Sequence, residues 1–431
     1  MEVAVAPTSS KEIAMTKSNT LEVLKQAFEK IIPSQDARTT VTPLEFVVCL
    51  VFCYLGDSKT FSLESIRRFM KAQLGRHLSR SAFWERLAGD RLKTHLRALV
   101  AELMVALTVS VTGGYQLLKQ LGVTAIWVID SSSFTLWARA KNQFPGTRTA
   151  AGIKWHAGFD LLTGLQTWFQ LTPTKTHDRK CFPEVNRLTG KLVLFDLGYW
   201  DFGLLQAIEK AGGFFLSRLK SKAVIEIAEV VQGLSKQWVG HALLSLDFGD
   251  KAGKIIEVFT TKVYRGHTLR YRVIGFWNPM AKEYHWYITN LIVPAYLIYP
   301  LYRLRWQIEL IFKACKNSLN ANQITSGDEN IIESLLLASI AAHLSTQPLF
   351  QLGLEEVEDD QQFAMSFQRI AQVAVALAPD FIRFLLNSAR EYFDQLWDKI
   401  KLFANEMFDP NYKKRETSLM RIQRLLCEGE V

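Results

Sequence analysis

The chain has 431 residues, 48% of them hydrophobic and 22% charged, which is an ordinary globular composition and long enough for two or three domains. Its five cysteines include no C-x-x-C pair, which argues against a disulfide framework or a zinc knuckle and suits a reducing compartment. The net charge of +9 favours a polyanionic partner.

The chain carries no signal for export or for membrane insertion. Its first twenty residues are polar and lack the basic and then apolar order of a secretion signal. The most apolar runs, residues 46–56 and 334–344, fall short of the roughly 20 residues that cross a bilayer. We therefore expect a cytoplasmic protein with no membrane role.

Helical periodicity extends from about residue 21 to residue 121 and predicts an all-helical N-terminal region over residues 1–122. Within it, residues 63–97 hold nine Lys or Arg against three acids. This stretch predicts a helix, a turn at Gly75 and a second helix from about Ser79, an arrangement like a helix-turn-helix. It indicates either a DNA-binding element or merely a solvated basic face.

Strands begin at about residue 124. Residues 124–134 contain a run of β-branched and aromatic residues that ends at Asp130, as in a strand buried on both faces. Residues 152–173 predict two more strands joined by a turn at 162–164, so the first three strands should form an antiparallel meander. A helix is expected from about His177.

The same alternation of strands and helices continues. Residues 191–200 predict a buried strand that ends at Asp196. Residues 202–213 predict a helix closed by glycine, and residues 214–219 predict a further strand. Three strands, a helix, a strand, a helix and a strand are the order of a ribonuclease H-like core, whose first part is assigned to residues 123–222.

The predicted fold class is α/β, with a ribonuclease H-like mixed sheet that has helices on both faces. Alternating apolar and polar residues separated by turn residues predict a β-rich insertion at 223–290. The second part of the core follows at 291–350, and a helical C-terminal region at 351–431. Helical N- and C-terminal regions therefore flank an interrupted core.

Asp130 and Asp196 each follow an apolar strand, and ligands bind at such strand ends in open α/β sheets. If the two strands are neighbours, the carboxylates converge, and a hard cation such as Mg²⁺ or Mn²⁺ relieves their repulsion. Glu309 would supply a third ligand from a helix packed across the sheet. For each aspartate taken singly, capping of the following turn is the alternative interpretation.

A polar stripe on the predicted helix 301–316 supports that site. Tyr302, Arg305, Glu309 and Lys316 fall within an arc of roughly 60° at 3.6 residues per turn. A solvated stripe with an Arg305–Glu309 ion pair is one interpretation. The other is a metal site for phosphoryl transfer, in which acids hold two divalent ions while the arginine and lysine hold phosphates.

Other acids and motifs have simpler explanations. Asp160 lies in a predicted hairpin turn, and Asp201 is expected to begin a helix. For Asp178, helix capping is favoured over a role beside the metals. The sequence has no G-x-S-x-G, no phosphate-binding loop motif and no H-E-x-x-H, so a serine hydrolase, an ATP-driven engine and a zinc enzyme have no support.

The segment "YRLRWQIELIFKACK" fits the signature Y-x2-R-x3-E-x6-K, and the chain here resembles bacterial insertion-sequence transposases of the DDE type. Residues 125–323 carry the resemblance, including "VIDSSSF" and "FDLGYWDFGLL" as the first and second acidic regions. It implies Asp130, Asp196 and Glu309 as the catalytic metal ligands, with Mg²⁺ or Mn²⁺. It implies DNA contacts for the other three signature residues, which are Tyr302, Arg305 and Lys316.

The leading functional hypothesis is therefore a transposase that binds transposon ends, cleaves the terminal phosphodiester with two metal ions and joins the 3′ hydroxyl to target DNA. Its partner is double-stranded DNA, and holding two ends implies a homodimer in the complex. A DNA-binding relative without catalysis and a nuclease of the same fold are the alternatives. Some family members form a DNA hairpin and use an insertion tryptophan; no motif selects among Trp238, Trp277 and Trp286.

Overall fold

The computed structural model describes residues 17–34, 40–53, 62–107, 112–246, 255–317, 324, 326–355, 365–409, 411 and 416–428, with side chains except at 17–19, 112–115, 354 and 355. The described residues before position 122 form helices: α1 (Lys17–Ile31), α2 (Pro43–Cys53), α3 (Leu63–Leu74), α4 (Arg80–Ala88), α5 (Asp90–Ala106) and α6 (Thr112–Leu121).

The basic stretch forms the predicted helix, turn and helix. Ser62 and Ser65 make a capping box that begins α3, and Gly75 ends it in the left-handed conformation with φ of 62°. The Ser79 side chain then accepts a hydrogen bond from the backbone N–H of Ala82 and begins α4. This local prediction is confirmed, whereas DNA contact by the hairpin stays a prediction.

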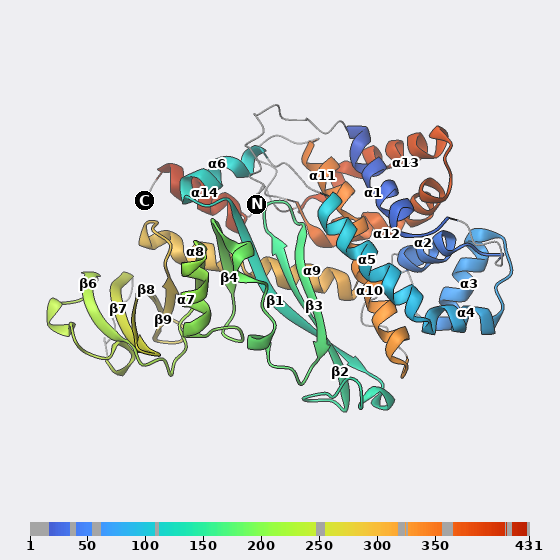
Figure 1. Cartoon of the computed structure of the whole chain (residues 1–431). Helices are drawn as coiled ribbons and strands as arrows, with labels where there is room; N and C mark the ends of the chain where they lie inside the picture. Colours follow the sequence, from blue (N-terminus) through green and yellow to red (C-terminus); the bar gives the residue numbers. More distant parts are fainter. Residues whose placement is uncertain are drawn as a thin grey trace, which may run out of the picture.

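The strands form one nine-stranded sheet in the order β3-β2-β1-β4-β5-β9-β8-β7-β6 (Figure 1). The strands are β1 (Ala125–Leu136), β2 (Ala151–Asp160), β3 (Gln166–Pro173), β4 (Lys191–Phe195), β5 (Phe214–Arg218), β6 (Glu226–Gln232), β7 (Ile255–Tyr264), β8 (His267–Asn278) and β9 (Glu283–Thr289). β1, β4 and β5 are mutually parallel, and the other pairs are antiparallel. The predicted meander and ribonuclease H-like mixed sheet are confirmed.

Helices cover both faces of this sheet, because alternate strand residues point into two separate cores. Ile126 and Val128 of β1 belong to a large core shared with the helices on one face. Trp127 and Ile129 belong to a smaller core on the other face, which α7 (Phe202–Lys210) covers. The sheet is thus buried between two apolar layers, as its near-continuous hydrophobic strands require.

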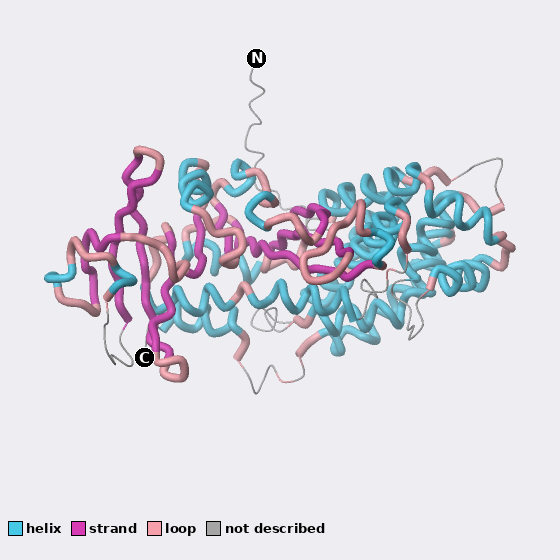
Figure 2. Tube along the Cα trace, turned by 90° about the horizontal axis from the view of Figure 1, so that it is seen from below, coloured by secondary structure: helices cyan, strands magenta, loops and turns pink. Residues whose placement is uncertain are grey.

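The remaining helices follow the sheet in the chain: α8 (Ile298–Arg303), α9 (Trp306–Asn317), α10 (Glu329–Ser345), α11 (Gln347–Glu355), α12 (Phe367–Leu386), α13 (Arg390–Phe403) and α14 (Ser418–Glu428). α10 is buried almost throughout and packs against α5 and α2. Figure 2 shows the resulting division, with strands toward one end of the molecule and helices toward the other. No described helix combines the length and apolarity that a bilayer span requires.

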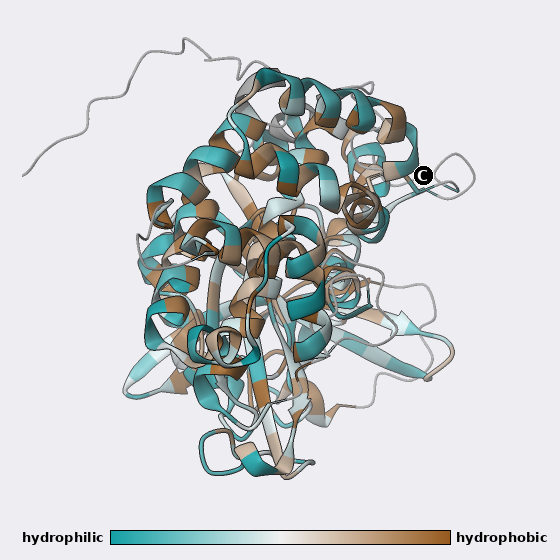
Figure 3. Ribbon diagram, turned by 90° about the vertical axis from the view of Figure 1, so that its right-hand side faces the viewer, coloured by the Kyte–Doolittle hydropathy of each residue, from teal (hydrophilic) through white to brown (hydrophobic). Residues whose placement is uncertain are grey.

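Hydrophobic side chains hold this helical end together. In Figure 3 they concentrate toward the middle of the bundle, and hydrophilic residues lie outside. Phe52 of α2 stacks on Phe381 of α12 with ring centroids 5.4 Å apart. Helices from the two ends of the chain therefore share one core, which the sequence pattern of either end alone does not reveal.

Two predicted helices differ from the structure. The helix expected from His177 is instead two short 3₁₀ segments, Asp178–Lys180 and Val185–Leu188. Pro183 lies between them, and proline disfavours a helical conformation in the residue before it. The second difference concerns the helix predicted at 301–316, which is divided into α8 and α9.

The strands β6 to β9 come from the region predicted as a β-rich insertion, and they extend the core sheet through the β5–β9 pair. Trp286 packs over Gly275, where an added Cβ would lie 2.5 Å from the indole ring. Trp277 makes an edge contact with Tyr284, and Trp238 lies in a 3₁₀ segment near the far edge of the sheet.

Candidate active site

The parallel pairing of β1 with β4 brings two predicted acids together. Ile129 is in register with Phe195, so Asp130 and Asp196 are the next residues along neighbouring strands. The prediction that Asp130 ends its strand is wrong, because β1 continues to Leu136. Beyond Ile129 it loses β4 as a partner and stays paired with β2 alone. Asp130 therefore lies where β1 becomes open on one side.

Asp196 begins a tight turn after β4. Its Oδ1 accepts a hydrogen bond of 2.7 Å from the backbone N–H of Gly198. A Cβ at position 198 would lie 2.9 Å from Asp196 Oδ1 and 3.0 Å from Asp178 Oδ2. Glycine is therefore needed here for steric reasons, since any side chain would displace one of the two carboxylates.

The third acid comes from α9, after a break that the sequence pattern did not predict. Between α8 and α9 the bonds from Arg305 N to Tyr302 O (3.0 Å) and from Ile308 N to Arg305 O (3.3 Å) are of the 3₁₀ type. A 3₁₀ turn advances about 120° per residue instead of 100°, so it rotates Arg305 relative to a straight helix. The prediction of one continuous helix is therefore wrong, although Glu309 stays beside Arg305.

Arg305 joins two of the acids. Its Nη1 donates to Asp130 Oδ2 and its Nη2 donates to Glu309 Oε1, both over 2.8 Å. The guanidinium is largely buried, with 17% of the side chain exposed. The i,i+4 pair with Glu309 thus exists, but the same side chain also reaches across to β1, which a solvated surface stripe does not explain.

The Asp130 carboxyl is perturbed by burial and by the charges around it. Burial raises the pKa of the Asp130 carboxyl to about 7, and the Asp196 and Glu309 carboxylates contribute to the rise. The Ser131 backbone N–H and the Arg305 guanidinium lower the pKa but do not cancel the rise. A buried carboxylate held near two others is an environment that favours a cation.

The fit of these residues to a divalent ion depends on how they are arranged and on Arg305. Among the described residues, no three His, Cys, Asp or Glu side chains are arranged as a set of metal ligands. Arg305 lies between Asp130 and Glu309, so these two acids are neutralised by a guanidinium in this structure. Carboxylate oxygens are donors that suit a hard divalent cation, and their mutual repulsion favours one.

Lys316 and Tyr302 flank the acids. The Lys316 Nζ donates to the backbone carbonyl of Ser133 over 3.0 Å and lies 4.9 Å from the centre of the Phe134 ring, and burial lowers its pKa. The Tyr302 ring packs 5.1 Å from that of Tyr287. The pKa of Tyr302 is raised, mainly by burial, so the side chain stays a neutral phenol.

The expectation that Asp178 caps a helix is wrong. The cap of that 3₁₀ segment is His177, whose side chain accepts from the backbone N–H of Arg179. The Asp178 Oδ1 instead accepts from Lys154 Nζ over 2.7 Å and from Ser131 Oγ over 3.3 Å. Asp178 therefore lies beside the acids. This position agrees with the less favoured prediction, a role beside the metals.

Behind Asp178 lies a buried hydrogen-bonded chain that sequence reasoning missed. His156 is fully buried, with Nδ1 3.0 Å from the Tyr199 hydroxyl and Nε2 2.9 Å from the Thr172 hydroxyl. Burial lowers the pKa of His156 to about 4, so the ring is neutral at pH 7. A lone histidine inside a strand gave no signal of this network, because its partners come from β3 and from the turn after β4.

The predictions for two other acids are confirmed. Asp160 Oδ1 accepts from the backbone N–H groups of Leu162 and Thr163 in the hairpin turn. Asp201 caps α7 by accepting from Gly203. Both carboxylates therefore have structural roles outside the acid cluster.

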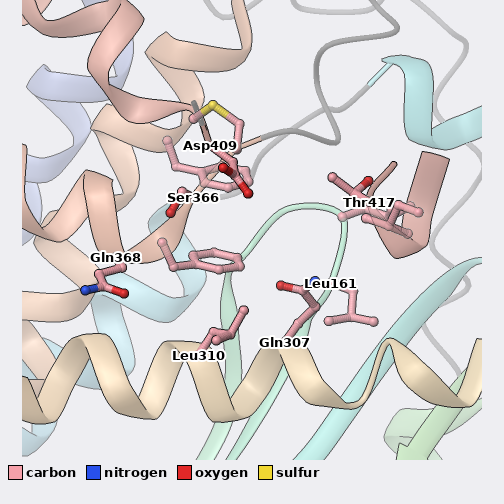
Figure 4. A pocket seen from close by; sticks show the side chains of 12 residues that line it. Leu161, Gln307, Leu310, Ser366, Gln368, Asp409 and Thr417 are labelled. Atoms are coloured by element: carbon pink, nitrogen blue, oxygen red, sulfur yellow. The ribbon is translucent and has the colours of Figure 1, made fainter. Parts of the chain in front are cut away.

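A cavity of about 150 Å³ lies on the other side of α9. Figure 4 shows Gln307 and Leu310 of α9 on one wall, with Ser366 and Asp409 across from them. Gln307 and Glu309 are two positions apart in α9, hence about 200° apart around its axis. The cavity is therefore separate from the acids.

Comparisons with known proteins identify the family of the chain. A family described as Transposase DDE domain matches residues 122–344, half of the chain. The transposase for insertion sequence element IS1151 of Clostridium perfringens is 23% identical over 350 residues, or 65% of this chain and 73% of that protein. The transposase for IS231D of Bacillus thuringiensis subsp. finitimus is 24% identical over 53% of this chain and 57% of its own length.

Among solved structures, the piggyBac transposase in a synaptic complex with hairpin DNA aligns with a TM-score of 0.44 and 10% identity, over 91% of this chain and 83% of that one. The assignment to a family rests on the match to residues 122–344. The chain belongs to the DDE transposase family.

Proposed function

We propose that the protein binds transposon ends, cleaves the terminal phosphodiester and joins the freed 3′ hydroxyl to target DNA. The observation that carries the proposal is that Asp130, Asp196 and Glu309 are brought together: Asp130 and Asp196 come next along paired strands, and Arg305 binds both Asp130 and Glu309. Three acids from distant parts of the chain have no common structural reason to meet in one partly open place.

In this proposal Asp130, Asp196 and Glu309 would hold two divalent ions, Mg²⁺ or Mn²⁺, which would supply activation of the attacking water or hydroxyl and stabilisation of the leaving oxygen. Arg305 leaves the carboxylates and pairs with a DNA phosphate, for which its planar guanidinium is suited. Lys316 offers its ammonium group to another phosphate of the DNA backbone. Tyr302 offers its phenol O–H to a phosphate oxygen. The chain supplies no covalent nucleophile.

The test is incubation of purified protein with end-bearing DNA, a target plasmid and Mg²⁺. Joined products support the proposal. Cleavage without joining would instead identify a nuclease, and a shifted but uncut band would identify a DNA-binding relative without catalysis.

Variants assign the acids in the same assay. Asp196→Asn and Glu309→Gln should each abolish cleavage while DNA binding remains. Asp398→Asn and Glu391→Gln, matched changes on the exposed face of α13, should cleave at the wild-type rate. Retained cleavage in Asp196→Asn or Glu309→Gln would disprove the assignment of that residue as a metal ligand.

A further inference from the structure

The connection between β1 and β2, residues 137–150, forms an exposed cationic surface, here called the hairpin tip. It extends beyond the sheet at the lower edge of Figure 1. The side chains of Arg139, Lys141 and Arg148 are exposed, and the sequence has no Asp or Glu between Asp130 and Asp160. None of the three cations forms an ion pair with another described residue. A solvated face usually mixes both signs of charge, so this composition indicates an anionic partner.

An exposed aromatic ring accompanies the cations. Trp137 is 58% exposed, and the Arg139 guanidinium lies 5.2 Å from the centre of its ring. Stacking on the indole restrains the guanidinium, so less conformational entropy is lost when it pairs with an anion.

The hairpin tip is an ordered part of the fold. Its backbone is held by hydrogen bonds from Phe144 N to Ala140 O (2.8 Å) and from Gly152 N to Phe144 O (3.0 Å). Another runs from Lys175 N to Pro145 O over 3.2 Å and ties the tip to the turn after β3. Its cations are therefore presented in defined positions.

The tip is continuous with the candidate active site along β1. Arg305 contacts Asp130, and Lys316 contacts Ser133 three residues further on. Gly327, which follows α9 in the chain, approaches the tip, since a Cβ there would lie 3.1 Å from Arg139 Cβ. From Asp130 to the end of β1 the strand rises about 20 Å, which is the length of about six base pairs.

We propose that the hairpin tip binds the sugar-phosphate backbone of the transposon-end duplex, about six base pairs from the phosphodiester that is cut. The inference rests on the proposed function, because the path of the duplex is set by Lys316, the signature residue assigned to end DNA. Arg139, Lys141 and Arg148 supply contacts that do not depend on base sequence, and they hold the duplex in position over the acids.

The first test measures the salt dependence of binding to an end-bearing duplex. Each lost phosphate contact lowers the slope of log K against log salt by about 0.9. The double variant Lys141→Gln/Arg148→Gln should therefore lose about 1.8 from the slope. Between 50 and 200 mM salt both proteins lose affinity. The factor by which the variant loses affinity should be about ten times smaller than the factor for the wild type.

The control is Arg390→Gln/Lys401→Gln, which removes two cations from the exposed face of α13. Its slope should equal that of the wild type. An unchanged slope in the tip variant, or an equal loss in the control, would overturn the proposal.

The second test locates the tip on DNA. Arg148→Cys in a Cys427→Ser background carries a tethered iron–EDTA group, since the other cysteines of the chain are buried. Radical cuts about six base pairs from the transposon terminus are expected. Cuts confined to the target plasmid, or an absence of cuts, would refute binding of the end duplex.

Adding Asp196→Asn to the tethered protein separates the two proposals. The radical cuts depend only on where the duplex lies, so they should persist when cleavage by the acids is lost. Loss of the radical cuts with intact transposition would refute the role of the tip alone. Retained DNA cleavage in Asp196→Asn without the tether would instead refute the assignment of this metal ligand.

Discussion

Replacing Asp130 by Asn should remove a pH-dependent loss of stability in the metal-free protein. Burial and the neighbouring carboxylates raise the pKa of Asp130 from its usual 3.8 to about 7. The folded state therefore binds a proton more tightly than the unfolded state does. The resulting stabilisation is complete below about pH 4 and is lost as the pH rises to about 7. Asparagine cannot titrate and should show no such loss.

The magnitude follows from the size of the shift. About three pKa units correspond to about 4 kcal/mol, of which about 3 kcal/mol is lost between pH 5 and pH 8. With an unfolding entropy of about 2.1 cal/mol/K per residue, 3 kcal/mol changes the Tm of a chain of 431 residues by about 3 °C. The difference in Tm, Asp130→Asn minus wild type, should therefore be about 3 °C larger at pH 8 than at pH 5.

The assay is thermal unfolding in EDTA at pH 5 and pH 8, with both proteins in the same buffers. Comparing the two proteins cancels every titration they share. Asp398→Asn, an exposed aspartate on α13, is the matched control and should differ from the wild type equally at both pH values. Adding Mg²⁺ at pH 8 should raise the Tm of the wild type more than that of Asp130→Asn. A pH-independent difference for Asp130→Asn would show that the pKa of Asp130 is not raised in the folded protein.

Two further substitutions examine the surroundings of the acids. Gly198→Ala places a Cβ 2.9 Å from Asp196 Oδ1 and 3.0 Å from Asp178 Oδ2, so DNA cleavage should fall about 100-fold while the fold is kept. Wild-type cleavage with an unchanged circular dichroism spectrum would contradict this. Tyr199→Phe leaves the buried Nδ1 of His156 without its partner and should lower the free energy of unfolding by about 1–3 kcal/mol, measured by denaturant titration. An unchanged unfolding midpoint would mean that another group satisfies this nitrogen.

Much of the fold was predictable from local patterns. The turn at Gly75, the cap of α7 at Asp201 and the hairpin turn at Asp160 each depend on residues within a few positions of one another. Glycine with positive φ and short polar side chains that bind nearby N–H groups leave their mark in sequence. Apolar runs likewise predicted the strands on either side of β1, because a sheet covered on both faces buries nearly every residue of its central strands.

The arrangement of the acids depended on distant segments. Asp178 binds Lys154 and Ser131 instead of capping a helix, and β1 continues past Asp130 because β2 remains its partner. Neither result follows from a local pattern, since both depend on strand register and on side chains that come from other strands.

By itself, the sequence predicted which residues would carry the chemistry, because acids and bases at helical spacing and acids within or after apolar runs are visible in it. Only the tertiary structure decided how those residues meet. The 3₁₀ break before α9 turns Arg305 toward both Asp130 and Glu309, and the parallel register of β1 with β4 sets Asp130 beside Asp196. Such long-range contacts are selected by the packing of the whole core, which no short window of sequence contains.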